Sequence, residues 1–101
     1  MITHIVLLKI SENDDKLKII QLIKKLAELQ NTSIPQIKNF GFGENNSPEG
    51  LNRGYTHCFT MQFLNTSDRD IYLLHKDHTD IATELCKLLE NGINSFLVID
   101  Y

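Results

Sequence analysis

Residues 3–10, with the sequence THIVLLKI, are apolar on both faces of the β-strand that they predict. Alternate side chains of a strand point to opposite faces, and here one face carries His4, Val6, Leu8 and Ile10 and the other Thr3, Ile5, Leu7 and Lys9. Such a strand needs cover on both sides, because water would otherwise contact an apolar surface. The chain must therefore fold so that helices cover one face of a sheet and something else covers the other.

An amphipathic helix is predicted next, over residues 12–30. Ser11 and Asp14 form an N-terminal capping pattern, because their side-chain oxygens can accept hydrogen bonds from the free N–H groups of a first helical turn. Apolar residues then recur at three- and four-residue steps, at Ile19, Leu22, Ile23, Leu26, Ala27 and Leu29. Lysines occupy much of the opposite side, so one side of this helix is expected to pack and the other to face water.

Two further strands are predicted on either side of a turn-rich loop. Residues 36–44 (QIKNFGFGE) alternate loosely, and Gly41 and Gly43 indicate a curved strand. The loop at residues 45–54 is longer than a usual hairpin turn and is therefore able to overhang a site. Residues 55–63 (YTHCFTMQF) alternate strictly, which places His57 on the same face as Phe59 and Met61.

The remaining chain predicts a helix broken into two pieces and a final strand. Ser67 with Asp70 repeats the capping pattern and opens a short helix that runs to His75, with a break near Lys76 and Asp77. The second piece, residues 79–90, buries Ile81, Ala82, Leu85, Leu88 and Leu89 and ends at Asn91 and Gly92. Residues 95–101 (SFLVIDY) predict the last strand.

This order of strand, helix, strand, strand, broken helix, strand is typical of the ferredoxin-like α+β fold. In that fold, helices cover one face of an antiparallel sheet. A chain of 101 residues suffices for one such domain, residues 1–101, and leaves no room for a second core. The other sheet face carries aromatic and aliphatic side chains, which a second copy of the chain is expected to cover. We therefore predict a homodimer in which two sheets pack face to face.

Charge and composition argue against several classes of function. The chain has 10 Lys and Arg against 13 Asp and Glu, a net charge of −3, whereas nucleic-acid and anionic-membrane surfaces require clustered positive charge. No segment is apolar for long enough to span a membrane, and the first residues lack a secretion signal, so a cytoplasmic protein is expected. Cys58 and Cys86 belong to no metal or redox motif, and no fingerprint of a nucleotide cofactor is present. No cofactor is predicted.

Histidines and a tyrosine are the candidates for chemistry, because a neutral imidazole can exchange a proton near pH 7. His4 and His57 lie on apolar strand faces, where the alternative interpretation is a hydrogen-bonded core histidine. Tyr72 and His75 are neighbours on one helix and His78 follows at its break, so a phenol and several imidazoles can converge on a proton-transfer site. The three-residue spacing of His75 and His78 is common by chance and differs from the usual zinc motifs, so no metal is predicted.

Several segments together resemble the stress-responsive A/B barrel (Dabb) family over essentially the whole chain. These segments are HIVLLK at residues 4–9, the Ile34-Pro35 turn, SPEG at residues 47–50, GYTH at residues 54–57, IYLLHKDH at residues 71–78 and FLVIDY at residues 96–101. Relatives commonly have His-Pro-x-His where this chain has Lys76, and a glycine where it has Gln36. The resemblance implies a dimeric α/β barrel built from two ferredoxin-like sheets, in agreement with the dimer predicted from the pattern.

The same resemblance implies site residues and two classes of function. The family includes plant polyketide cyclases, in which the residues that match Tyr72 and His78 catalyse an aldol condensation and those that match His4 and His57 line the pocket. We therefore expect Tyr72 and His78 to be catalytic, and His4, His57 and His75 to contact a small carbonyl-containing metabolite. The alternative is a stress protein without catalytic activity, in which the histidines belong to the core. An apolar cavity with a mouth favours the first function, and a filled interior the second.

Overall fold

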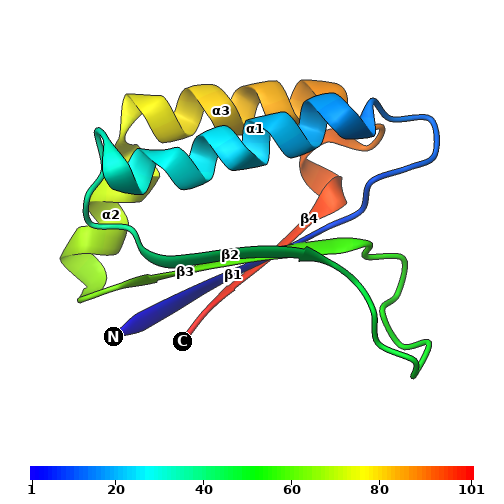
Figure 1. Ribbon diagram of the computed structural model, residues 1–101, viewed down its shortest axis with the longest axis horizontal. Helices are drawn as coiled ribbons and strands as arrows, with labels where there is room; N and C mark the ends of the chain where they lie inside the picture. Colours follow the sequence, from blue (N-terminus) through cyan, green and yellow to red (C-terminus); the bar gives the residue numbers. More distant parts are fainter.

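A four-stranded antiparallel sheet and a layer of helices on one of its faces make up the molecule, in a computed structural model that describes residues 1–101 (Figure 1). The strands are β1 (Ile2–Leu8), β2 (Lys38–Glu44), β3 (His57–Phe63) and β4 (Phe96–Asp100), in the order β2-β3-β1-β4. The helices are α1 (Lys16–Glu28), α2 (Thr66–Leu74) and α3 (Lys76–Leu88), with short 3₁₀ turns at Leu29–Asn31 and Gly92–Ser95. The predicted ferredoxin-like α+β fold is confirmed.

The register of the sheet decides which side chains are neighbours. β1 lies between β3 and β4 and runs antiparallel to both, so that His4 is paired with Met61 on one side and with Asp100 on the other. β2 and β4 are therefore the edge strands, and β4 is the shorter of the two. Side chains of the outer strand β4 consequently have a neighbouring strand on one side only.

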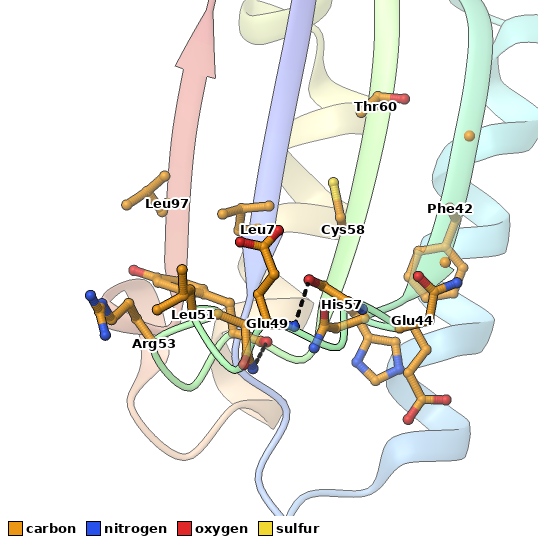
Figure 2. A pocket seen from close by; sticks show the side chains of 17 residues that line it. Leu7, Phe42, Glu44, Glu49, Leu51, Arg53, His57, Cys58, Thr60 and Leu97 are labelled. Atoms are coloured by element: carbon orange, nitrogen blue, oxygen red, sulfur yellow. Dashed lines mark hydrogen bonds between the residues drawn. The ribbon is translucent and has the colours of Figure 1, made fainter.

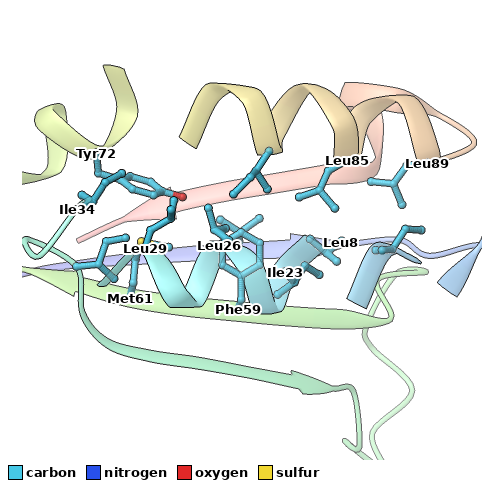
Figure 3. Packing of buried hydrophobic residues seen from close by; sticks show 14 of the residues in the cluster. Leu8, Ile23, Leu26, Leu29, Ile34, Phe59, Met61, Tyr72, Leu85 and Leu89 are labelled. Carbon is cyan, nitrogen blue, oxygen red and sulfur yellow. The ribbon is translucent and has the colours of Figure 1, made fainter. Parts of the chain in front are cut away.

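The core lies between the sheet and the helices (Figure 3). Alternate residues of β1 and β3 point into it, and the burial of both strands alternates along their length. Sixteen buried apolar residues form one cluster, which includes Leu8, Ile23, Leu26, Phe59, Met61, Tyr72 and Leu85. β3 begins two residues later than the strictly alternating stretch predicted at residues 55–63, and its alternation is that of a strand with one face in this core.

The first helix begins later than the sequence pattern predicts. Asp15 caps α1, because its side chain accepts a hydrogen bond from the backbone N–H of Lys18. Ser11 and Asp14, which the sequence suggested as the cap, instead close a turn of their own: the Asp14 carboxylate accepts from the Ser11 N–H at 2.8 Å. Several closely spaced capping residues made this boundary ambiguous, and the fold uses the one nearest the apolar repeat.

The second helix is interrupted at His75. Asn65, one of the residues before the predicted Ser67 cap, begins α2 by accepting a hydrogen bond from the Asp68 N–H. His75 has extended backbone (φ −67°, ψ 135°) and separates α2 from α3. Its Nδ1 accepts a hydrogen bond from the Asp77 N–H at 3.0 Å, so the imidazole is the N-cap of α3. The predicted break is present, and α3 starts three residues earlier than expected.

The opposite face of the sheet has no helix on it (Figure 1). Ile5 and Leu7 of β1 point to this face, together with Leu97 and Ile99 of β4, which are 36% and 54% exposed. The curvature predicted for β2 is present as a register irregularity between Lys38 and Gly41. None of the three helices has the length and apolarity needed to span a membrane.

Candidate functional site

A cavity of about 230 Å³ lies between the sheet and the helices, next to the edge strand β4. Most of its wall is apolar and comes from every layer of the fold: Val6, Leu26, Phe59, Leu73, Ala82, Leu85, Ile93, Phe96 and Val98. His4, Tyr72, Cys86 and His78 supply the polar atoms. We call this cavity the His/Tyr pocket. Val98 and Ile93, which are 55% and 72% exposed, place its mouth beside β4.

Tyr72 reaches into the pocket from α2. Its side chain is almost fully buried, and Figure 3 shows the hydroxyl oxygen directed toward the space between the sheet and α3. Burial, and secondly the negative charge of Asp100, raise the pKa of Tyr72 well above its ordinary value. The phenol therefore keeps its proton at physiological pH and is a hydrogen-bond donor.

His78 lies against Tyr72, with ring centroids 4.1 Å apart. Its Nδ1 is 3.1 Å from the carbonyl oxygen of Leu73, and a carbonyl only accepts, so Nδ1 carries the proton. In the neutral ring Nε2 then has a free lone pair. Every fully buried side-chain nitrogen or oxygen in the protein has a hydrogen-bond partner. Because Nε2 of His78 has none, it is not fully buried and a ligand can reach it.

The pKa of His78 is lowered from its ordinary value of 6.5, mainly by burial. The hydrogen bond to the Leu73 carbonyl raises this pKa and the nearby His4 and His75 lower it, but burial is the largest effect. His78 is therefore neutral at pH 7. A neutral imidazole with a fixed Nδ1–H and an open Nε2 is able to act as a base.

His4 is held by a carboxylate that the sequence analysis did not identify. Its Nδ1 donates to Asp100 Oδ1 at 2.6 Å, and the second oxygen of Asp100 accepts from Arg69 Nη1 at 3.4 Å. The His4 ring meets the Tyr72 ring edge-on at 5.7 Å. Asp100 thus fixes which His4 nitrogen faces the pocket, because Nδ1 is occupied and Nε2 is not. Only the pairing of β1 with β4 brings these residues together, and no local pattern encodes that pairing.

The structure does not place His57 in the same pocket. His57 is paired with Leu8 at the other end of the strand, about 13 Å along the sheet from the position opposite His4. Its ring stacks on Phe42 with centroids 5.7 Å apart, and its Nδ1 is 2.8 Å from Thr56 Oγ1. Burial lowers the pKa of His57; Glu44 raises it and Lys16 lowers it further. His75 also lies outside the wall of the His/Tyr pocket, as the cap of α3.

A second hollow lies on the open face of the sheet, where the loop at residues 45–56 curls beneath it (Figure 2). Its volume is about 770 Å³, and it combines Leu7, Cys58 and Leu97 of the sheet with Glu49, Leu51 and Arg53 of the loop, all labelled in Figure 2. The loop predicted to overhang a site therefore overhangs this hollow and not the His/Tyr pocket. No three His, Cys, Asp or Glu side chains are grouped so that they could hold a metal ion.

Comparison with known proteins identifies the family to which this sequence is similar. The family model described as the Stress Responsive A/B Barrel Domain matches residues 2–101. A stress-response A/B barrel domain-containing protein, HS1 of Arabidopsis thaliana, is 33% identical over 100 residues, which is 99% of this chain and 87% of that protein.

Two solved structures share the fold. A dimeric ferredoxin-like protein of unknown function from Jannaschia sp. CCS1 has a TM-score of 0.88 at 24% identity, covering 99% of this chain and 96% of that one. A hydroxynitrile lyase from Passiflora edulis has a TM-score of 0.84 at 24% identity, covering 99% of this chain and 90% of that one. At this level of identity the likeness is one of fold.

Proposed function

This chain belongs to the stress responsive A/B barrel domain family, and from that membership we propose that it binds a small carbonyl compound in the His/Tyr pocket and moves a proton at the neighbouring carbon. One observation carries the proposal. His78, with an open Nε2, and Tyr72, with an unbonded hydroxyl, line the same apolar cavity, and their ring centroids are 4.1 Å apart. A base next to a hydrogen-bond donor is the pair of groups that enolate formation requires.

The proposed step divides the work between the two side chains. Nε2 of His78 accepts the proton from the carbon beside the carbonyl. The electron pair of that C–H bond forms the C=C bond of the enolate, and the π pair of the carbonyl moves onto its oxygen. The Tyr72 hydroxyl donates a hydrogen bond to this oxygen as its negative charge develops. Return of the proton from His78 to carbon completes an exchange cycle. In a condensation, the enolate carbon attacks a second carbonyl, and the alkoxide formed on that carbonyl takes the proton back from His78. The apolar wall excludes water, which strengthens both interactions.

The size of the pocket and the relatives support this class of reaction. A volume of about 230 Å³ is below the roughly 300–1,000 Å³ of pockets for drug-sized ligands, so the substrate is small. One protein with the same fold is named a hydroxynitrile lyase, so the fold carries lyase chemistry elsewhere. The resemblance of Tyr72 and His78 to the catalytic pair of the polyketide cyclases agrees with the proton-transfer role.

A non-catalytic stress function is the second candidate, and one observation favours it. Each of the four imidazoles has a hydrogen-bonding neighbour for its Nδ1 within the chain, as histidines with only a structural role would have. The curated relative HS1 is named for stress response and not for a reaction. The catalytic function predicts that replacing His78 slows proton transfer at the substrate carbon, whereas the non-catalytic function predicts that there is no such transfer to slow.

We further propose that two copies pack through the open faces of their sheets. Ile5, Leu7, Leu97 and Ile99 lie on a face that no helix covers, and covering apolar surface stabilises an assembly. The similar protein from Jannaschia sp. CCS1 is described as dimeric and ferredoxin-like, which supports the same arrangement here. The His/Tyr pocket lies on the helical side of the sheet, so this packing leaves it intact.

The exchange of hydrogen for deuterium beside a carbonyl tests the proposed function. Hexan-2-one and methyl levulinate are incubated with the protein in D₂O, and proton NMR follows the loss of the α-hydrogen signals. The wild-type protein is expected to accelerate exchange; His78→Gln should slow it about 100-fold or more, and Tyr72→Phe about 100-fold.

His57→Gln is the matched control, since it removes an imidazole outside the His/Tyr pocket and should leave the exchange rate unchanged. Circular dichroism of each variant checks that it is folded. Exchange that is no faster than in buffer, or equally fast in wild type and His78→Gln, contradicts the proposal and favours the non-catalytic function.

A further inference from the structure

We infer that the His/Tyr pocket selects uncharged carbonyl compounds and rejects carboxylates, an inference that rests on the proposed function and narrows its substrate class. No Lys, Arg, Asp or Glu lines the cavity. Its polar atoms are those of two imidazoles, a phenol and the thiol of Cys86, and all other lining side chains are apolar. A bound carboxylate would lose its water and meet no fixed positive charge, which is costly in an apolar site.

Arg69, the cation that contacts Asp100 behind His4, is paired with two carboxylates. Arg69 contacts Asp100 through Nη1 at 3.4 Å and Asp70 through Nε at 3.2 Å. Arg69 itself does not line the pocket. Asp100 lies behind His4, whose Nδ1 is bonded to it, so this carboxylate disfavours a second carboxylate beside His4.

The imidazoles do not replace the missing cation. His78 gives its only N–H to the Leu73 carbonyl, and His4 gives its N–H to Asp100. His78 therefore presents an unprotonated Nε2 to a ligand, and its lone pair repels a carboxylate oxygen, while His4 is already bound to a carboxylate. The lowered pKa of His78 supports this, because it keeps the ring uncharged at pH 7. The Tyr72 hydroxyl remains as a single donor, which suits one neutral carbonyl oxygen.

A matched pair of ligands tests the selectivity. Methyl levulinate and levulinate contain the same ketone and differ in whether the other end is an ester or a carboxylate. Titration of each into the ¹⁵N-labelled wild-type protein at pH 7.5, followed by NMR, gives two dissociation constants. The ester is expected to bind at least about tenfold more tightly than the acid. Equal binding, or tighter binding of levulinate, overturns the inference.

A variant at the mouth of the pocket tests the physical cause. Val98 lines the cavity from the exposed edge strand, so Val98→Lys places an ammonium group at the entrance and leaves the histidines and Tyr72 in the sequence. In Val98→Lys the affinity for levulinate relative to that for the ester should rise about tenfold over wild type. Val98→Gln, which is polar and uncharged, should leave the preference for the ester as in wild type. No gain for levulinate in Val98→Lys contradicts the charge argument.

The outcomes separate this inference from the proposed function. If the ester and the acid bind and exchange equally well, the pocket is catalytic but not selective, and only the inference fails. If neither molecule shifts the resonances of pocket residues and neither exchanges, the proposed function itself fails. A preference for the ester that Val98→Lys reverses, together with exchange that depends on His78, supports both.

Discussion

His78 uses its two ring nitrogens for different purposes. Nδ1 is committed to the Leu73 carbonyl, at the end of the preceding helix, and this contact fixes both the orientation of the ring and its tautomer. Nε2 is thereby left as the only basic atom of the ring. The sequence pattern predicted Tyr72 and His78 as a pair, and the structure places their rings 4.1 Å apart.

Asp100 marks the limit of prediction at this scale. An acidic residue near the end of the last predicted strand carries no local signal of contact with His4, since the two are joined only through the register of β1 and β4. His57 shows the same limit in reverse. His57 shares the apolar face of the sheet with His4 but lies too far along the sheet to share its pocket. The alternation of apolar residues predicts which face a side chain is on, but not how far along the sheet it lies.

The pH dependence of exchange follows from the lowered pKa of His78. Protonated His78 has no lone pair at Nε2, so the exchange rate should fall as the pH falls through the pKa of this residue. That midpoint is expected below 6.5, the ordinary value, and the rate should stay level above it because Tyr72 keeps its proton until well above pH 10. A pH–rate profile of wild-type protein measures this. A midpoint above 6.5, or a rate that falls with rising pH near neutrality, would show that the base has been assigned wrongly.

The same pKa shift predicts a pH effect on stability. The unfolded chain, with the ordinary pKa of 6.5, binds a proton to this side chain more readily than the folded protein does. Its contribution to the free energy of unfolding is therefore complete above pH 6.5 and is lost as the pH falls from there through the lower folded pKa. Urea unfolding at a series of pH values, for wild type and His78→Gln, measures it. The wild type should lose more stability on acidification than the variant, and parallel curves would contradict this.

At the scale of elements, the corner between α2 and α3 is held by histidines. His75 caps the first turn of α3, and His78 donates to a carbonyl in the last turn of α2. The orientation of His78, the proposed base, therefore depends on how α3 begins after α2. Apolar periodicity predicted that the helices exist, while their first residues depended on which of several capping side chains the chain uses, and that choice was beyond the sequence pattern.

Replacing the capping imidazole tests its role in this corner. His75→Ala should lower the free energy of unfolding by about 1 kcal/mol, because the Asp77 N–H loses its acceptor. His75→Asn, whose side-chain oxygen can accept the same hydrogen bond, should restore most of the loss. Urea denaturation of the three proteins at pH 7.5 compares them. Equal stability of wild type and His75→Ala would show that the cap contributes nothing.

At the scale of the whole molecule, the two faces of the sheet have different surroundings. Helices cover one face and enclose the His/Tyr pocket, whereas the other face is open in the single chain (Figure 1). The apolar residues on both faces of β1 predicted that both faces need cover, and the predicted order of helices and strands supplies helices for one face only. What covers the open face is a property of the assembly, and no single chain determines it.

Charge on the open face tests the proposed dimer. Ile99→Glu places a carboxylate on the expected interface and should convert the dimer to monomers, since desolvating an unpaired charge is unfavourable. Ile71→Glu is the matched control: Ile71 is 45% exposed on α2, away from this face, and this variant should stay dimeric. Analytical ultracentrifugation of the three proteins gives their masses. A monomeric wild type, or a dimeric Ile99→Glu, would contradict the face-to-face arrangement.

The protonation state of His78 in the presence of a neutral ligand tests the central claim most directly. Long-range ¹H–¹⁵N NMR of the histidine rings at pH 7.5, assigned with His78→Gln, distinguishes a protonated from an unprotonated ring nitrogen. We expect a neutral His78 with its proton on Nδ1. Its Nε2 resonance should move when methyl levulinate is added, whereas the ring resonances of His57 and His75 should not. A His78 that carries its proton on Nε2, or whose Nε2 resonance ignores the ligand, would contradict the account of the pocket as a site of proton transfer.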